Sequence, residues 1–306
     1  MSTAAIDVTG LRKRFGDHTV IDDIDLTVHR GEVFALLGPN GAGKTTSINI
    51  LTTLTQADSG TATIAGFDVR TQPVAVQQRI SLTGQSAAVD DALSATENVV
   101  MFARLSGLSV RAARRRASEL LDRFGLSDAA SRRVRTYSGG MRRRLDLALS
   151  FVVTPEVLFL DEPTTGLDTR SRRDLWQLIR SLADAGTTVF LTTQYLEEAD
   201  QLADRIAVLN DGRITAVGSA AELKSRIGGD TVEVHDELGG LLRSVPTDGT
   251  VTGLRTALDQ LDAQGAEGTV TLRRPTLDDV FLALTEPDIS RTGALVGAAP
   301  VQESAE

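Results

Sequence analysis

A glycine-rich stretch in the first fifth of the chain has the spacing of a phosphate-binding loop. Its members are, in order, Gly38, Pro39, Asn40, Gly41, Ala42, Gly43, Lys44, Thr45 and Thr46. Glycines let the backbone turn tightly and direct its N–H groups at phosphate oxygens, while Lys44 can reach the β- and γ-phosphates. The hydroxyl of Thr45 is suited to hold Mg²⁺. The stretch predicts a site for a nucleoside triphosphate such as ATP.

Lysine is rare in this chain, which strengthens the assignment of the loop. Of the 32 lysines and arginines, only Lys13, Lys44 and Lys224 are lysines. A lysine inside a chemical motif is therefore hard to attribute to chance. The loop also lies between a continuous apolar run, Val33–Leu37, and a helix-compatible stretch, Thr45–Leu54. A buried strand followed by a helix N-terminus is the setting in which such loops bind phosphate.

A second apolar run, Val157–Leu160, is followed directly by two acids, Asp161 and Glu162. Because successive side chains of a strand point to opposite faces, we expect these two carboxylates to have different roles. Asp161 is the candidate to hold Mg²⁺, directly or through water. Glu162 is then the candidate general base that polarises the attacking water.

The surrounding pattern predicts an α/β fold with a parallel sheet. Residues 5–36 have the alternation and turn signals of short strands, and residues 86–155 are mostly helical in pattern. A helix is expected over 170–184. Further apolar strands are expected at 157–160, 188–192 and 206–209. Strands that alternate with helices favour a parallel sheet.

The C-terminal part of the chain has a different composition. Gly228, Gly229 and Asp230 have the character of a linker. Beyond them, strands are expected at 231–235 and 268–273, and helices at 253–263 and 276–284. We therefore expect a small α+β domain over 229–285 and a disordered tail over 286–306, where Pro, Gly, Ala, Ser and Glu predominate.

Three motifs in this order make the chain similar to ABC transporter ATP-binding subunits. They are the phosphate loop, the stretch Tyr137–Leu145 (Tyr-Ser-Gly-Gly-Met-Arg-Arg-Arg-Leu) and the stretch Val157–Asp168 (Val-Leu-Phe-Leu-Asp-Glu-Pro-Thr-Thr-Gly-Leu-Asp). The resemblance implies a P-loop NTPase fold over 1–228. In that fold a parallel-sheet core carries an N-terminal antiparallel β subdomain and an inserted helical subdomain at about 86–155.

The resemblance also implies roles for residues that the spacing alone does not assign. Ser138, Gly139 and Gly140 resemble the family's signature motif, which binds the γ-phosphate of the ATP held by the opposite protomer. This implies a head-to-tail dimer with a second copy, with two ATP molecules between the copies. By the same resemblance, Asp168 links the two sites across that dimer.

Two further roles follow from the same resemblance. Gln85 looks like the glutamine that contacts Mg²⁺ and senses the membrane partner. Phe15 is placed like the aromatic residue that stacks on adenine, although a single phenylalanine near a strand is also common in a core.

The chain departs from the family pattern at two positions. Gln194 stands where such proteins usually have a histidine that contacts the γ-phosphate. A glutamine can still donate and accept hydrogen bonds there, but it cannot become cationic, so we expect a modest loss of transition-state stabilisation. Met141 stands where the signature often has glutamine. We expect this change to matter less because backbone donors bind the anion.

Two stretches narrow the resemblance to drug-export ATPases of the daunorubicin-resistance type. They are 192–200 (Thr-Thr-Gln-Tyr-Leu-Glu-Glu-Ala-Asp) and 274–285 (Arg-Pro-Thr-Leu-Asp-Asp-Val-Phe-Leu-Ala-Leu-Thr). This implies export of a drug, antibiotic or other hydrophobic compound through a separate integral membrane permease, bound near Gln85 and 93–108. Import stays open on chemistry alone, because both directions use the same cassette.

Composition excludes several other classes of protein. The chain has a net charge of −9, no cysteine and only three scattered histidines. A general nucleic-acid binder, a disulfide scaffold, a thiol enzyme and a multi-histidine metal site are therefore not expected. With no signal peptide and no apolar run of about 18 residues, we expect a peripheral protein on the cytoplasmic side of the cell membrane. A soluble ABC ATPase without a transport role and an ATP-binding regulatory module remain as alternatives.

Overall fold

The computed structural model describes residues 4–84, 88–265 and 267–285. The chain divides into two compact units, with the boundary between Leu223 and Lys224. The expected tail, 286–306, lies outside the described residues. Among the residues that are described, no helix is both long and apolar enough to cross a membrane.

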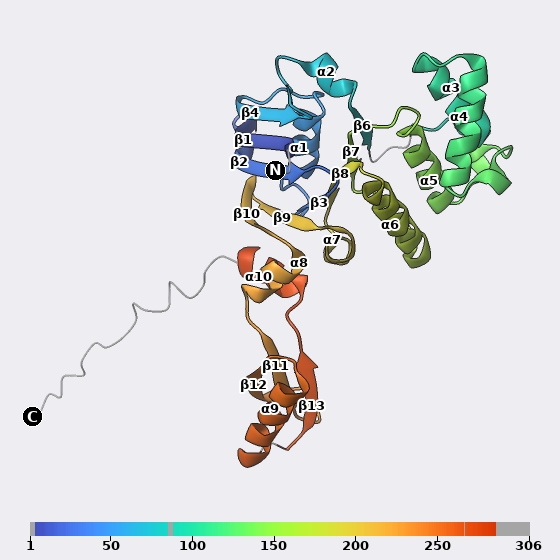
Figure 1. Ribbon diagram of the computed structural model, residues 1–306. Helices are drawn as coiled ribbons and strands as arrows, with labels where there is room; N and C mark the ends of the chain where they lie inside the picture. Colours follow the sequence, from blue (N-terminus) through green and yellow to red (C-terminus); the bar gives the residue numbers. More distant parts are fainter. Residues whose placement is uncertain (1–3, 85–87, 266, 286–306) are drawn as a thin grey trace, which may run out of the picture. The chain divides into compact units, whose positions relative to one another are not determined.

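An antiparallel sheet opens the first unit (Figure 1). Its strands are β1 (Ala4–Phe15), β2 (His18–His29), β4 (Ser59–Ile64) and β5 (Phe67–Asp68), in the order β2-β1-β4-β5. The hairpin turns at Gly16, where φ is 60°, and the alternating apolar side chains of β1, such as Ile6 and Val8, are buried. This sheet is the N-terminal β subdomain expected from the sequence.

A mixed, mostly parallel sheet forms the centre of the first unit. Its strands are β3 (Val33–Leu37), β6 (Ile80–Thr83), β7 (Val157–Asp161), β8 (Thr188–Thr193), β9 (Arg205–Asn210) and β10 (Arg213–Gly218). The order is β10-β9-β3-β8-β7-β6, and only β10 runs antiparallel to its neighbour. Every residue of β3 and β7 is buried, as their continuous apolar runs predict.

Strand register decides which residues meet at the edge of this sheet. In the parallel pairs, Leu37 lies beside Thr193 and Asp161 lies beside Thr192. The loop after β3, the acids after β7 and the residue after β8 therefore emerge at the same edge. This is the edge at which parallel α/β sheets bind their ligands.

Four helices belong to this part of the unit. They are α1 (Lys44–Leu51), α2 (Pro73–Gln77), α6 (Thr169–Asp184) and α7 (Leu196–Leu202). Phe190 of β8 stacks on Phe34 and tilts against Phe159, with ring centroids 5.7 and 5.5 Å apart, so three neighbouring strands share one aromatic core. Helix α1 is shorter than expected because the backbone leaves the helical region by Thr53, where φ is +66°.

The helical region consists of α3 (Ala95–Leu105), α4 (Val110–Arg123), α5 (Gly139–Leu149) and two short 3₁₀ turns, Ser127–Ala129 and Val134–Thr136. Helix α3 begins with a capping box between Ser94 and Glu97. Helix α4 buries Ala113, Ala117, Leu120 and Leu121. Most of its arginines are exposed, as the helical spacing predicts.

The second unit is a three-stranded antiparallel sheet with helices. Its strands are β11 (Asp230–His235), β12 (Leu241–Thr247) and β13 (Thr269–Arg273), in the order β12-β11-β13. Helix α9 (Val251–Ala263) buries Ala257 and Leu261 against this sheet. Helix α8 (Ala220–Ser225) lies at the boundary, and α10 (Leu277–Thr285) ends the described chain. Strand β12 was not expected from the sequence, because Pro246 and its exposed leucines obscure the alternation.

Candidate active site

The phosphate loop joins β3 to α1, as the sequence predicts. Gly43 precedes the helix with a φ of +107°, and a Cβ there would lie 2.8 Å from both the Val20 carbonyl oxygen and the Ile21 Cδ1. Only glycine fits this position, because both the backbone angle and the surrounding space exclude a side chain. No side chain in the described part of the chain caps the first turn of α1, so its N–H groups remain available to an anion.

The ammonium of Lys44 is held inside the loop. Its side chain is only 4% exposed, and Nζ donates to the carbonyl oxygens of Gly38 at 2.9 Å and Pro39 at 3.1 Å. Nζ also lies 3.2 Å from Oε1 of Glu162. The positive charge is therefore fixed where the phosphates of a nucleotide would meet the loop.

Asp161 ends β7, and its carboxylate is surrounded by threonine hydroxyl groups. The Thr45 hydroxyl donates to Asp161 Oδ2 at 3.1 Å, and the Thr192 hydroxyl donates to Asp161 Oδ1 at 2.6 Å. These contacts orient the carboxylate, whose residue is 4% exposed. Sequence reasoning missed Thr192, because its proximity to Asp161 depends on the adjacency of β7 and β8.

The backbone at Glu162 differs from the extended conformation expected from the sequence. We expected strand alternation to separate it from Asp161, but β7 ends at Asp161 and Glu162 adopts the left-handed φ of +47°. Its N–H donates to both the carbonyl and the hydroxyl oxygen of Thr192, each at 3.1 Å. Its Oε2 accepts from Thr165 Oγ1 at 3.3 Å. A local turn, held by the neighbouring strand, therefore directs this carboxylate toward Lys44.

Lys44, Thr45 and Glu162 line one open cleft of about 590 Å³, and Asp161 is reached from it through the Thr45 hydroxyl. Its lining consists of Val20, Asn40, Gly41, Gly43, Lys44, Thr45, Thr46, Glu162, Thr165 and Gln194. Gln194 comes from the end of β8, so the structure brings this substituted position to the same cleft as Lys44 and Glu162. A loop of N–H donors, an ammonium, two carboxylates and an amide can together bind and activate a phosphate ester.

The signature residues and Asp168 form a second group. Ser138 caps α5 by accepting from Met141 N, and Asp168 caps α6 by accepting from Ser171 N and Oγ. Gly140 lies close to α6, because a Cβ there would lie 2.7 Å from Ser171 Oγ. Ser138, Gly140 and Asp168 do not line the phosphate-loop cleft.

Comparisons with known proteins identify the family. The model of the ABC transporter family matches residues 21–165. The daunorubicin resistance ATP-binding protein DrrA3 of Streptomyces coeruleorubidus is 49% identical, covering 94% of this chain and 98% of that protein. The daunorubicin/doxorubicin resistance ATP-binding protein DrrA of Streptomyces peucetius is 51% identical, covering 92% of this chain and 93% of that protein. This chain belongs to the ATP-binding proteins of the ABC transporter family.

A solved structure agrees with this assignment of the fold. The cbiO1 protein of Clostridium perfringens, part of the ABC transporter complex cbiONQ, matches with a TM-score of 0.68 and 25% identity. The match covers 72% of this chain and 90% of that one. The family, the P-loop NTPase fold and the ATPase class expected from the sequence are therefore confirmed.

The predicted adenine-stacking residue of this ABC protein lies outside the lining of the cleft. Phe15 ends β1, is 53% exposed and has the Lys13 ammonium 5.2 Å from its ring centroid, but it does not line the cleft. Gln85 lies outside the described residues.

Behind Gln194, the ABC protein has a buried carboxyl group that the sequence analysis did not single out. Glu198 on α7 is 1% exposed, and Trp176 Nε1 donates to its Oε1 at 3.1 Å. Burial raises the pKa of Glu198 above its ordinary value. This hydrogen bond joins the only tryptophan in the sequence, on α6, to the helix that follows Gln194.

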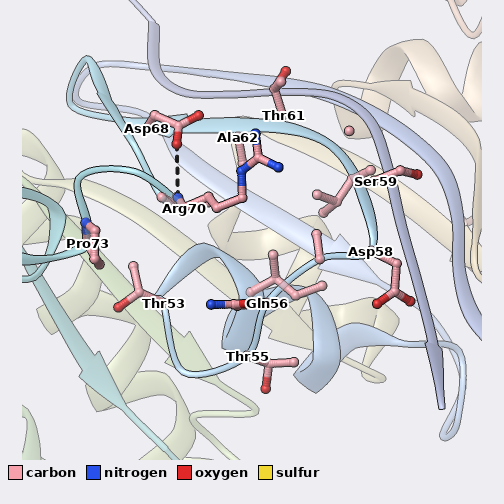
Figure 2. A pocket seen from close by; sticks show the side chains of 15 residues that line it. Thr53, Thr55, Gln56, Asp58, Ser59, Thr61, Ala62, Asp68, Arg70 and Pro73 are labelled. Carbon is pink, nitrogen blue, oxygen red and sulfur yellow. Dashed lines mark hydrogen bonds between the residues drawn. The ribbon is translucent and has the colours of Figure 1, made fainter.

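A separate polar hollow of about 140 Å³ lies beside β4 (Figure 2). Its lining includes Thr53, Thr55, Gln56, Asp58 and Arg70, and the Asp68 carboxylate accepts from Arg70 N at 3.0 Å. None of the predicted site residues that the structure describes lines it. The phosphate-loop cleft is therefore the candidate active site.

Proposed function

We propose that this chain is the ATP-hydrolysing subunit that powers export of a drug, antibiotic or other hydrophobic compound through a separate membrane permease. The observation that carries the proposal is the convergence of Lys44, Asp161, Glu162 and Gln194 around the phosphate loop. Support for the cargo class comes from the relatives, which are daunorubicin and doxorubicin resistance proteins over nearly their whole length. The contacts of the cargo itself belong to the permease in this proposal.

ATP binds with its phosphates on the loop from Gly38 to Thr46 and its adenine on Phe15. The exposure of Phe15, which is 53%, supports stacking because an exposed aromatic ring is accessible to a base. Lys44 then exchanges its contact with Glu162 for the β- and γ-phosphates. This exchange leaves the Glu162 carboxylate without its cation and available to a water molecule.

The oxygen donors beside the loop fit Mg²⁺. Thr45 and Asp161 offer hard oxygen ligands 3.1 Å from each other, and Gln85 is proposed as a further contact on sequence grounds. Mg²⁺ binds few protein ligands and completes its shell with phosphate and water. When bound, it would neutralise charge on the phosphates during transfer.

The chain's own residues divide the work of hydrolysis. Glu162 accepts the proton of the attacking water. Thr165 and Thr192 hold Glu162 in place by hydrogen bonds. Lys44 and the N-terminus of α1 stabilise negative charge that develops on the γ-phosphate. Gln194 orients the water or the phosphate by hydrogen bonds but contributes no positive charge.

A second copy of the chain completes each site. Ser138, Gly139, Gly140 and Asp168 lie at helix N-termini, and none of these four residues lines the chain's own cleft, which supports a role across a head-to-tail dimer. Two copies would then enclose two ATP molecules and separate after hydrolysis. This motion would drive the permease from one access state to the other.

The location and domain roles follow from this proposal. The nucleotide-binding domain spans 1–228, with the helical subdomain at about 86–155 serving the permease. The small domain, 229–285, and the tail, 286–306, have no assigned task in catalysis. The chain would be peripheral on the cytoplasmic side of the membrane, attached through the permease.

Phosphate release from MgATP tests the proposal. The purified chain would be assayed alone and with its co-purified membrane partner in lipid, with Lys44→Ala as the blank. Release that needs Lys44 and rises with the partner supports a transport motor. Release that the partner leaves unchanged favours an ABC ATPase without a transport role. No Lys44-dependent release in either state would identify a regulatory ATP-binding module.

A further inference from the structure

A buried ion pair lies one turn into helix α5, behind the signature residues. Arg143 Nη1 and Asp146 Oδ2 are 3.3 Å apart, and their side chains are 12% and 5% exposed. Burial lowers the pKa of Arg143 and raises the pKa of Asp146, so both charges are costly at this place. Because a buried ion pair adds little net stability, stability alone does not account for this one.

The arginine of this pair contacts the backbone of two segments that emerge at the catalytic edge of the sheet. Its Nε donates to the carbonyl oxygen of Pro163 at 2.9 Å, and its Nη1 donates to that of Gly84 at 2.8 Å. Pro163 directly follows Glu162, and Gly84 directly follows β6, the neighbour of β7. One guanidinium therefore joins α5 to the chain segments after two adjacent strands.

The aspartate of the pair adds a third connection. Asp146 Oδ1 accepts from Ala88 N at 2.9 Å. Gly84 and Ala88 are thus both tied to the same helix, one through each member of the pair. Together the two side chains fix three backbone groups to α5, the helix that Ser138 caps.

The guanidinium also retains a hydrogen-bonding group without a partner. Among the described residues, Arg143 Nη2 is buried and makes no hydrogen bond. Arg143, Glu162, Pro163 and Gly139 line a common hollow of about 290 Å³. The pair therefore lies at a place where a shift of α5 would change the position of the Glu162 segment.

We propose that Arg143 and Asp146 are positioning residues for ATP hydrolysis, which hold Pro163, Gly84 and Ala88 in register with the signature helix α5. The inference rests on the proposed ATPase function. A small displacement of a reacting group can cost about 100-fold in rate. Loss of the pair should therefore slow turnover more than it weakens nucleotide binding, because neither residue lines the phosphate-loop cleft.

Arg116 offers a matched control. It lies on α4, and its Nε and Nη2 donate to the carbonyl oxygens of Val152 and Phe151 at 3.2 and 2.7 Å. It thus makes the same kind of backbone contact as Arg143, but it touches no segment of the active site. Arg116→Lys should lower stability without changing kcat per folded molecule.

The experiment compares Arg143→Lys, Asp146→Asn, their double variant and Arg116→Lys in the full chain. Steady-state MgATP hydrolysis gives kcat and KM, titration with a fluorescent ATP analogue gives affinity, and thermal unfolding gives the folded fraction. We expect each variant of the pair to lower kcat by about tenfold or more, with KM and affinity changed by less than about threefold. The double variant should lose little more than either single variant, because the two residues act as a unit.

Several outcomes would overturn the inference. A loss of kcat in Arg143→Lys no larger than in Arg116→Lys would make the pair merely structural. A raised KM with unchanged kcat would assign the pair to binding instead of positioning. Multiplicative losses in the double variant would separate the two residues. Should Arg143→Lys fail to fold, Asp146→Asn carries the same test, because it keeps an acceptor for Ala88 N and removes the charge.

The two proposals fail in different ways. If the unmodified chain releases no Lys44-dependent phosphate, the ATPase function fails and the positioning role falls with it. If the unmodified chain is active and the Arg143 and Asp146 variants behave like Arg116→Lys, only the positioning role fails.

Discussion

The ammonium of Lys44 lies 3.2 Å from Oε1 of Glu162, so the proposed phosphate ligand and the proposed general base form an ion pair. A bound γ-phosphate would draw Lys44 away and free the carboxylate. We predict that Glu162→Gln lowers kcat by about 100-fold or more, because an amide cannot accept the proton of water. MgATP binding should persist, since the loop is unchanged. Phosphate release and nucleotide retention measure the two effects separately.

The same variant distinguishes an enzyme from a regulatory module. An enzyme carrying Glu162→Gln should trap ATP and form a stable dimer, which light scattering detects. Lys44→Ala is the control, because it should lose both binding and dimer formation. Unchanged nucleotide retention and an unchanged oligomeric state in Glu162→Gln would argue against turnover by this chain.

Thr192 should be required for the geometry of Asp161 and Glu162. Thr192→Val keeps the shape of the side chain but removes the hydroxyl that donates to Asp161 and accepts from Glu162 N. We expect a decrease of about 10–100-fold in activity at limiting Mg²⁺, as is typical when a residue that orients a metal ligand is changed. Titration of activity with Mg²⁺ measures this.

Thr188→Val is the matched control for that experiment. Thr188 begins the same strand and is equally buried, but its hydroxyl accepts from Gly31 N, away from the cleft. Its variant should lose some stability and keep its Mg²⁺ dependence. Equal losses of activity in the two variants would contradict the role given to Thr192.

Gln194→His should raise turnover modestly. A histidine at the end of β8 could carry positive charge toward the γ-phosphate, which the amide cannot. The increase should be larger below about pH 6.5, where an unperturbed imidazole is protonated. Turnover measured between pH 6 and 8 tests this, and an unchanged rate throughout would show that this position is not limiting.

Glu198 should make the stability of the chain depend on pH. Burial raises its pKa above the ordinary value of 4.5, so the folded state binds more protons than the unfolded state above that pH. The stabilising contribution of Glu198 to the folded state is therefore fully present below about pH 4.5. It is lost as the pH rises through the pKa that Glu198 has in the folded state. Glu198→Gln removes this titration, so its Tm relative to the unmodified chain should rise from pH 5 to pH 8.

An exposed glutamate supplies the comparison for Glu198. The side chain of Glu119 is 52% exposed on α4, and Glu119→Gln is measured beside Glu198→Gln as the substitution at an exposed site. Parallel Tm profiles for Glu198→Gln and the unmodified chain would show that folding does not raise the pKa of this carboxyl group.

Gly140 and Gly139 should differ in their tolerance of a methyl group. A Cβ at Gly140 would lie 2.7 Å from Ser171 Oγ, which itself donates to Asp168, whereas a Cβ at Gly139 would lie 3.6 Å from Leu167 Cδ2. Gly140→Ala should lower the free energy of unfolding by about 1–3 kcal/mol through overpacking. Gly139→Ala should leave it nearly unchanged, and chemical denaturation compares the two variants.

Much of the first unit could be predicted because its signals are local. The apolar runs of β3 and β7, the turn at Gly16 and the helical spacing in α4 each depend on neighbours in sequence. Strand β12 could not be predicted, because its register comes from pairing with β11 and its exposed side chains break the alternation. The left-handed turn at Glu162 likewise comes from Thr192 on an adjacent strand.

The amino-acid sequence by itself determined the chemistry of this protein. Glycine spacing, a rare lysine and two acids after an apolar strand require no tertiary information, because the residue types and their order carry the motif. Only the tertiary structure decided how Thr192, Arg143 and Asp146 support those groups. Their partners after the strands lie 20 to 59 positions away in the sequence, the nearest being Pro163 and the farthest Gly84, both bound by Arg143. Only the order of the strands and the packing of α5 bring these groups within hydrogen-bonding distance.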